Sequence, residues 1–194
     1  MPIKLLLATK NRHKADEIKE TLGSGFEILT MSDVGIDVDV VEDGATFEEN
    51  AAKKAREIFA LTGLPTLADD SGLEVDYLHG APGVHTARYA GEHATSEENI
   101  AKLLAALDGV PAHLRGARFV CVLALRLPGQ EVKLLRGECG GRILFAPQGS
   151  DGFGYDPVFL DEKYDLSFAQ LPAHIKNVIS HRAKALRKLR KEFV

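Results

Sequence analysis

Two adjacent carboxylates, Asp69 and Asp70, are the residues of this sequence whose type and spacing most directly suggest chemistry. Residues 64–68 before them are largely apolar, and Ser71 and Gly72 follow. The apolar run predicts a buried strand, so the acids are expected where that strand emerges, a position that commonly faces the ligand in α/β proteins. Turn and capping roles would equally explain the two aspartates, and this segment alone does not separate the alternatives.

More acids lie upstream in the sequence, at Glu42, Asp43, Glu48 and Glu49. Carboxylate oxygens are hard ligands that suit Mg²⁺, which usually takes one or two of them and completes its shell with water and substrate phosphates. A water bound to such an ion, close to a further carboxylate, can be deprotonated for attack on phosphorus. This set of acids suits Mg²⁺ as a cofactor, and turn and capping roles for Asp69 and Asp70 are the equal alternative.

A basic segment near the N-terminus supplies groups of opposite charge. An apolar run over residues 3–8 predicts a strand, and apolar residues at helical spacing after Asn11 predict a helix that Asn11 caps. Lys10, Arg12 and Lys14 lie at this turn, where free backbone amides and positive side chains can bind phosphate. The glycines of a P-loop are absent, and a plain capped helix with solvated basic residues is the alternative.

A second predicted helix begins at Thr46 and ends near Gly63, and Thr46 and Glu49 have the spacing of a capping box. One face carries the apolar residues Phe47, Ala51, Ala55 and Ile58, and the opposite face carries Asn50, Lys53, Lys54 and Glu57. The same kinds of signal predict a helix over residues 95–107 and a hairpin of strands over residues 118–127 and 131–138.

Residues 149–157 form a glycine-rich loop with two aromatic side chains, Phe153 and Tyr155, and two acids, Asp151 and Asp156. Glycine allows a backbone to approach a ligand closely, and an aromatic held there can stack on a base. A tight connection with its aromatics packed into the core is the alternative interpretation.

The last predicted helix runs over residues 174–193. Arg182 falls on its apolar stripe and therefore needs a partner, because an unpaired buried charge is costly. The donors near the start of this helix are Lys176, Ser180, His181 and Arg182. Such donors can read the carbonyl oxygen of a six-keto purine, whereas the amino group of adenine would leave them unpaired. His181 by itself is also explained as a structural histidine.

Composition limits the class of protein. The chain has 194 residues, of which 45% are hydrophobic and 27% charged, and this predicts a single domain over residues 1–194. A net charge of −4 gives no field that would hold the chain on a nucleic acid or an acidic membrane. Cys121 and Cys139 lack metal-binding spacing and are expected to be reduced thiols, with Cys121 in a buried strand. Because residues 1–20 lack a signal-peptide apolar region and no run approaches the roughly 20 apolar residues that span a bilayer, the expected compartment is the cytoplasm.

Several motifs occur in order along nearly the whole chain. They are Thr9-x-Asn11-x-x-Lys14, Thr46-Phe47-x-Glu49-Asn50-Ala51-x-x-Lys54-Ala55, Ala68-Asp69-Asp70-Ser71-Gly72-Leu73, Gly80-Ala81-Pro82-Gly83, Ala87-Arg88-Tyr89, Gly152-Phe153-Gly154-Tyr155-Asp156-Pro157 and Ser180-His181-Arg182. Each motif is weak alone, but the ordered set resembles the inosine triphosphate pyrophosphatase family, also called Ham1-like or RdgB-like proteins.

The resemblance implies a mixed α/β fold with a long twisted central sheet and two lobes around a substrate cleft, and it implies a homodimer. The implied reaction is hydrolysis of inosine, deoxyinosine or xanthosine triphosphate (ITP, dITP, XTP) to the monophosphate and pyrophosphate. Such a reaction would cleanse the nucleotide pool and prevent incorporation of these nucleotides into DNA and RNA.

The resemblance also implies roles for residues at the matching positions. The triphosphate would be bound by Thr9, Lys10, Asn11, Arg12, His13, Lys14 and Lys54. Glu42 and Asp70 would hold Mg²⁺, with Asp43 as the alternative to Glu42, and Asp70 would also accept a proton while Asp69 and Lys54 support catalysis. The nucleoside pocket would be lined by Ser71, Phe153, Gly154, Tyr155, Asp156, Lys176, His181 and Arg182.

Two other functions compete with this one. A pyrophosphatase of the related Maf-like group would act on other modified or standard nucleotides. A nucleotide-sensing module would bind without turnover, using the acids and donors for recognition only.

Overall fold

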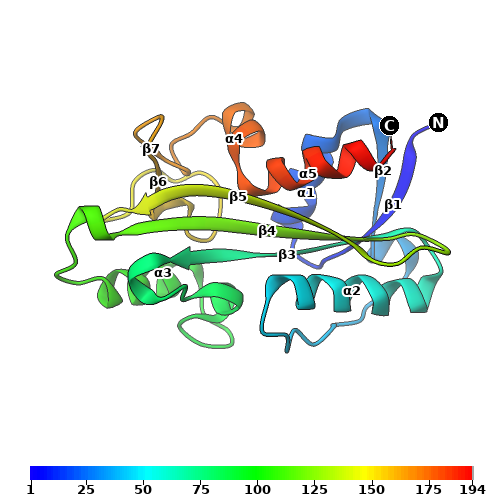
Figure 1. The fold of residues 1–194 in the computed structure, drawn as a ribbon, viewed down its shortest axis with the longest axis horizontal. Helices are drawn as coiled ribbons and strands as arrows, with labels where there is room; N and C mark the ends of the chain where they lie inside the picture. The colour runs from blue at the N-terminus through cyan, green and yellow to red at the C-terminus, as the bar shows by residue number, and fades with distance from the viewer. Residues whose placement is uncertain (194) are drawn as a thin grey trace. The chain divides into compact units, whose positions relative to one another are not determined.

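A computed structural model describes residues 1–193 and contains a mixed seven-stranded sheet in the order β2-β1-β3-β4-β5-β6-β7 (Figure 1). The strands are β1 (Ile3–Ala8), β2 (Phe26–Thr30), β3 (Thr66–Val75), β4 (Gly116–Arg126), β5 (Lys133–Ile143), β6 (Phe159–Asp161) and β7 (Leu166–Ser167). The helices are α1 (Arg12–Leu22), α2 (Phe47–Thr62), α3 (Ser96–Ala106), α4 (Ala173–Ile179) and α5 (His181–Arg190). Strand β1 pairs in parallel with β2 and β3, whereas β6 pairs antiparallel with β5 and β7, so the predicted mixed α/β class is confirmed.

The chain divides into two compact units. The first unit contains residues 1–70 and 121–137 and the chain from Arg182 onward, and the second contains residues 71–120 and 138–181. Strands β3, β4 and β5 contribute residues to both units. Two of the boundaries fall between candidate site residues, because Asp70 is followed by Ser71 and His181 by Arg182.

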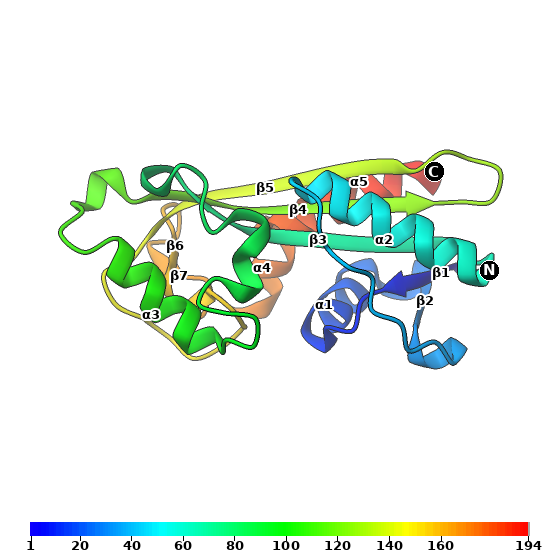
Figure 2. The same ribbon diagram turned by 90° about the horizontal axis from the view of Figure 1, so that it is seen from below.

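In the first unit, α1 and α5 cover one face of the strands and α2 covers the other (Figures 1 and 2). The buried cluster beneath α1 and α5 includes Ile18, Leu186, Leu5 and Leu123. Full burial of such side chains stabilises a fold by about 1.5–3 kcal/mol each. The predicted start of α1 is confirmed, because the side chain of Asn11 accepts the backbone N–H of Lys14 at 3.2 Å.

In the second unit, the core is built on aromatic contacts. The ring of Phe119 on β4 lies 4.5 Å from that of Phe159 and 5.6 Å from that of Phe168, and Leu103 of α3 belongs to the same cluster. Helix α3 carries the capping box expected at Thr95. Over residues 1–193, no helix combines the length and apolar character that crossing a membrane requires.

Two sequence-based boundaries were wrong. Strand β3 continues to Val75, so Asp69, Asp70 and Ser71 lie inside the strand and not after it. Strand β1 pairs with β3 over residues 66–68, and β4 is the other neighbour of β3 in the sheet. The predicted helix over residues 174–193 is interrupted at Ser180, whose φ of −63° and ψ of 160° are extended values typical of a residue that precedes a helix.

Helix α2 also differs from the prediction in two respects. The hydroxyl of Thr46 accepts the N–H of Glu49 at 3.1 Å as expected, but the Glu49 carboxylate accepts the N–H of Ala45 and leaves the capping box incomplete. The expected placement of Asn50 and Lys54 on the face opposite the apolar stripe was wrong, because both are buried and, at about 3.6 residues per turn, they lie along the edge of that stripe beside Phe47. The buried side of α2 therefore includes two polar residues.

Candidate active site

Asp69 is the centre of a buried polar cluster in the first unit. The residue is 1% exposed, and its Oδ1 accepts from Lys14 Nζ at 2.5 Å. Its Oδ2 accepts from Arg182 Nε at 3.1 Å and from Cys121 Sγ at 3.1 Å. Although burial favours the neutral acid, Lys14 and Arg182 hold the pKa of Asp69 well below its ordinary value. Asp69 is therefore ionised and fixed in place.

Arg182 is held by two carboxylates. It is 2% exposed, and it pairs with Asp69 through Nε and with Glu17 of α1 through its terminal nitrogen. Burial opposes the charged form, but Asp69 and Glu17 outweigh it and raise the pKa of Arg182. The sequence-based expectation that this inward arginine has a partner is confirmed.

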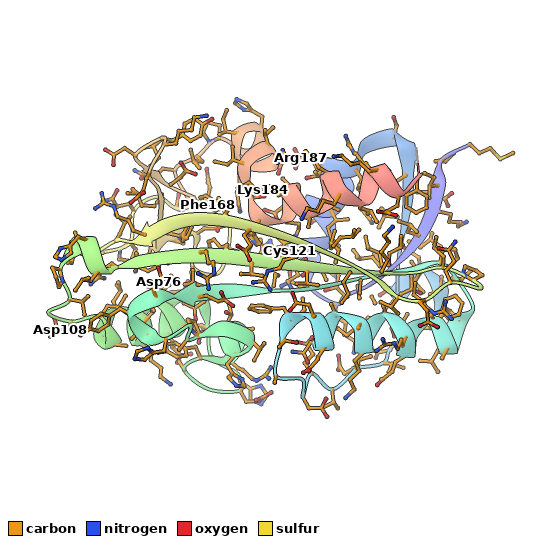
Figure 3. The ribbon with its side chains drawn as sticks, in the orientation of Figure 1. Asp76, Asp108, Cys121, Phe168, Lys184 and Arg187 are labelled. Carbon is orange, nitrogen blue, oxygen red and sulfur yellow. The ribbon has the colours of Figure 1, made fainter. Side chains whose placement is uncertain are left out.

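Two members of this cluster were not identified from the sequence. Glu17 lies three residues after Lys14 on α1, and that spacing places both on one helix face, so the helical period could have pointed to it. Cys121 is fully buried near the middle of β4 (Figure 3) and was interpreted only as a core thiol. Burial, chiefly, raises the pKa of the Cys121 thiol, which stays protonated and donates to Asp69.

Lys54 brings together the acids of a second cluster. Its Nζ lies 2.9 Å from Glu42 Oε1 and 3.6 Å from Asp70 Oδ1, and it donates to the backbone oxygen of Asp69 at 2.7 Å. Burial lowers the pKa of Lys54, but Asp70 and Glu42 together raise it by more than burial lowers it, so the net shift in pKa is upward. Asp43 instead pairs with Lys53 at 2.6 Å. Of the two alternatives, Glu42 is the acid beside Lys54.

Asp69 and Asp70 are adjacent, yet the pKa values of their carboxyl groups are shifted in opposite directions. Burial raises the pKa of Asp70 even though Lys54 and Lys14 act against it. Environments that push the pKa values of paired acids apart are a common basis for assigning acid and base roles. Asp70 is the stronger base of the two.

The carboxylates of the second cluster fit one kind of metal site. Among residues 1–193, no three or more histidine, cysteine, aspartate or glutamate side chains form a group that could hold a metal ion. Glu42 and Asp70 nevertheless both lie close to the Nζ of Lys54, at 2.9 and 3.6 Å. Because Mg²⁺ usually takes one or two carboxylates and obtains its other oxygens from water and substrate phosphates, this pair suits an ion that arrives with a phosphate ligand.

The N-terminal segment divides into residues that face the acids and residues that do not. Thr9 accepts the N–H of Asn11 at 3.2 Å, so both side chains shape the turn before α1. Lys10 reaches Asp37 at 2.8 Å and Asp39 at 3.0 Å. The candidates Arg12 and His13 are exposed. Of the predicted cations here, Lys14 is the one paired with Asp69.

A third cluster lies in the second unit. The buried Asp156 accepts the N–H of Phe153 at 2.9 Å and the Nζ of Lys176 at 2.7 Å, and this Nζ lies 5.2 Å from the centre of the Phe153 ring. Gly152 has a φ of +78°, and a Cβ there would lie 2.1 Å from the Asp156 carboxylate. The glycine-rich loop thus brings an aromatic ring, an acid and a lysine together. Gly154, with a φ of +61°, continues the same turn.

The remaining predicted residues of the second unit occupy different surroundings. Tyr155 is buried, its hydroxyl donates to the backbone oxygen of Thr86 at 2.9 Å, and burial raises its pKa. His181 is buried and stacks on Phe119, with ring centres 4.9 Å apart and planes at 18°. Ser71 is half-buried on β3. The core alternative therefore holds for Tyr155, whereas Phe153 belongs to the polar cluster.

These features together define a class of protein. Carboxylates beside lysines suit a phosphate that carries Mg²⁺, and an aromatic ring can stack on a base, so these features fit an α/β protein that acts on nucleoside phosphates. The sequence profile of the Ham1 family matches residues 5–192, and the chain belongs to this family.

Relatives and solved structures agree with this membership. The dITP/XTP pyrophosphatase of Bacillus licheniformis is 49% identical over 95% of this chain and 95% of its own length. The dITP/XTP pyrophosphatase of Vibrio cholerae is 48% identical, with 96% of this chain and 94% of its own covered. The Ham1 protein of Staphylococcus aureus superimposes with a TM-score of 0.89 at 39% identity, over 98% of this chain and 97% of its own.

Proposed function

We propose that this enzyme hydrolyses ITP, dITP and XTP to the corresponding monophosphate and pyrophosphate, and so removes them from the nucleotide pool before they enter DNA and RNA. One observation carries the proposal: Lys54 joins Glu42 and Asp70, while the neighbouring Asp69 is fixed by Lys14. The names of the relatives, dITP/XTP pyrophosphatases, support the substrate class.

The first-unit residues act on the triphosphate. An ammonium group has three donors, and Lys14 uses one on Asp69, so two remain for phosphate oxygens. Lys54 already faces Glu42, Asp70 and the backbone oxygen of Asp69, so it orders the acids. Asp70 accepts the proton of the attacking water. Catalysis then depends chiefly on position and charge stabilisation, as in other phosphoryl transfers.

We further propose that Glu42 and Asp70 hold Mg²⁺. When bound, the ion would neutralise developing charge on the phosphates. The cytoplasm is the proposed compartment and a homodimer the proposed assembly, and both rest on the sequence-based expectations. Light scattering on the purified protein tests the dimer, and a monomer mass would exclude it.

A further part of the proposal is that Phe153, Asp156 and Lys176 select the base. Phe153 offers a ring face for stacking, and Lys176, oriented by Asp156, offers a donor to the carbonyl oxygen of a six-keto purine. An adenine amino group would leave that donor unpaired, at a cost of about 1–3 kcal/mol. This corresponds to roughly a tenfold to hundredfold preference.

A panel of triphosphates tests the function. We expect rapid pyrophosphate release from ITP, dITP and XTP, slow release from ATP, GTP, CTP and UTP, and little release without Mg²⁺. Equal rates across the panel would refute the selectivity, and a preference for other modified nucleotides would favour the Maf-like alternative. Binding without any pyrophosphate release would favour the sensing module.

A further inference from the structure

Asn50 of α2 is a buried polar residue to which the proposed function gives no role. It is 1% exposed and lies at the edge of the apolar stripe of the helix. Lys54 is four residues further along the helix and therefore lies on the same face, one turn away. Lys54 contacts Glu42 and Asp70, so Asn50 is next to the elements that carry these acids.

The side chain of Asn50 holds the loop that carries Glu42. Its Oδ1 accepts the backbone N–H of Gly44 at 2.8 Å, and Gly44 is two residues after Glu42. A Cβ on Gly44 would lie 2.7 Å from this oxygen and 2.8 Å from Glu49 Cβ, so the loop backbone lies directly against the helix. One helix face thus holds the loop at two points, at Gly44 through Asn50 and at Glu42 through Lys54.

The sequence pattern around Asn50 occurs a second time in the chain, at a helix start where the asparagine has a structural role only. Thr46–Asn50 and Thr95–Asn99 both read Thr-x-Glu-Glu-Asn at a helix start. Asn99 is 4% exposed, its Oδ1 accepts the N–H of Ala90 at 2.7 Å, and its Nδ2 donates to the backbone oxygen of Ala87 at 3.1 Å. Both halves of the Asn99 amide are satisfied within the protein.

The amide of Asn50 is satisfied on one side only. Because the Gly44 N–H can only donate, the oxygen of Asn50 faces it and Nδ2 points elsewhere. Among residues 1–193, the buried Nδ2 has no hydrogen-bond partner. A buried donor without a partner costs about 1–3 kcal/mol. The hydrogen bonds of Asn99 therefore explain its burial as a contribution to stability, whereas those of Asn50 explain its burial only in part.

We propose that Asn50 is a positioning residue for metal binding, which fixes the Glu42 carboxylate beside Asp70 by holding Gly44. The inference rests on the proposed function, in which Glu42 and Asp70 take Mg²⁺. Groups that orient a metal ligand typically contribute on the order of 10–100-fold to metal affinity or activity.

Three variants test the proposal. Asn50→Leu removes the acceptor at similar volume, Gly44→Ala disturbs the same contact from the loop side, and Asn99→Leu is the matched control at the second copy. The first readout is the affinity of the protein alone for Mn²⁺, measured by titration with electron paramagnetic resonance. The second is the Mg²⁺ concentration that gives half-maximal ITP hydrolysis. Thermal unfolding reports the stability of each variant.

We expect Asn50→Leu and Gly44→Ala each to weaken Mn²⁺ binding and raise the Mg²⁺ requirement on the order of tenfold or more, while KM for ITP at saturating Mg²⁺ changes little. Asn99→Leu should lower thermal stability without changing either metal readout. The double variant of Asn50 and Gly44 should lose little more Mn²⁺ affinity than the single variant that binds Mn²⁺ more weakly, because both substitutions break the same contact.

Wild-type metal affinity in folded Asn50→Leu, or an equal loss in Asn99→Leu, would overturn the proposal. If Asn50→Leu does not fold, Mn²⁺ binding by Gly44→Ala and Asn50→Asp tests the proposal in its place. Asn50→Asp keeps an acceptor for the Gly44 N–H and should bind Mn²⁺ at least as well as wild type, so a loss in that variant counts against positioning. Absence of pyrophosphate release by the wild-type protein would instead refute the proposed function, since the Mn²⁺ titration does not depend on turnover.

Discussion

Replacing Arg182 with methionine should lower the free energy of unfolding by roughly 3 kcal/mol. The guanidinium is 2% exposed, and it pairs with Asp69 at 3.1 Å and with Glu17. Methionine fills similar space but carries no charge, so both carboxylates lose a partner. Breaking a buried pair in this way typically costs about 3–5 kcal/mol, because a charge is left uncompensated.

The surroundings set the expected loss at the lower end of that range. Asp69 keeps its contacts with Lys14 and Cys121, and the side chain of Glu17 is 16% exposed and can regain some water. The total stability of a domain is about 5–15 kcal/mol, so the variant should still fold at room temperature.

Urea denaturation followed by circular dichroism measures the loss, with the slope of the transition as a check that the two end states are unchanged. Arg187→Met is the matched control, because Arg187 is an exposed arginine on the same helix (Figure 3). That control should stay within about 0.5 kcal/mol of wild type. A loss in Arg182→Met no larger than in the control would refute the interpretation of Arg182 as a buried bridge.

Three further predictions concern other buried charges. Asp70→Asn should abolish pyrophosphate release and leave the unfolding curve nearly unchanged, and substantial activity in this variant would contradict the role of Asp70 as proton acceptor. The pKa of Asp69 is depressed, so the stability that its ionised form contributes is present above its ordinary pKa of 3.8 and is lost as pH falls further. Acid unfolding of wild type should therefore begin at a higher pH than acid unfolding of Asp69→Asn, once the stability that the variant has lost at neutral pH is added back. Arg115→Met should lower the unfolding free energy on the order of 3 kcal/mol, because the buried guanidinium donates to the backbone oxygens of Leu107, Ile143 and Leu144, and urea denaturation with a change under 1 kcal/mol would argue against this.

The local elements were predictable because their signals are local. Helix α1 begins after Asn11 and α3 begins after Thr95, as the capping residues indicate, since capping depends on neighbours in the sequence. The continuation of β3 through Asp69 and Asp70 was not predictable in this way. It depends on backbone pairing with strands that are remote in the sequence, which overrides the weak strand preference of aspartate.

The site was predictable where a residue broke a pattern. Arg182 could be identified because it places a charge on an apolar stripe. Glu17 and Cys121 fit the patterns of a surface acid and a core thiol. Helical spacing places Glu17 on the face of Lys14, but its pairing with Arg182 and the contact of Cys121 with Asp69 depend on the fold. The same holds for Asn50, whose side-chain oxygen accepts the N–H of Gly44 from a loop that the sequence alone does not place against α2.

The charges of the two first-unit clusters differ, and the difference suits the first to a supporting role and the second to binding an ion. In the first cluster, the charges of Asp69 and Glu17 are balanced by those of Lys14 and Arg182, so its net charge is zero and it does not by itself attract a metal cation. In the second, the carboxylates of Glu42 and Asp70 face one cation from Lys54, which leaves one negative charge in excess. A divalent cation would reverse that excess to one positive charge, and the second cluster would then attract a phosphate group that it would otherwise repel. Ion and triphosphate should therefore bind to this cluster with positive coupling, each strengthening the binding of the other.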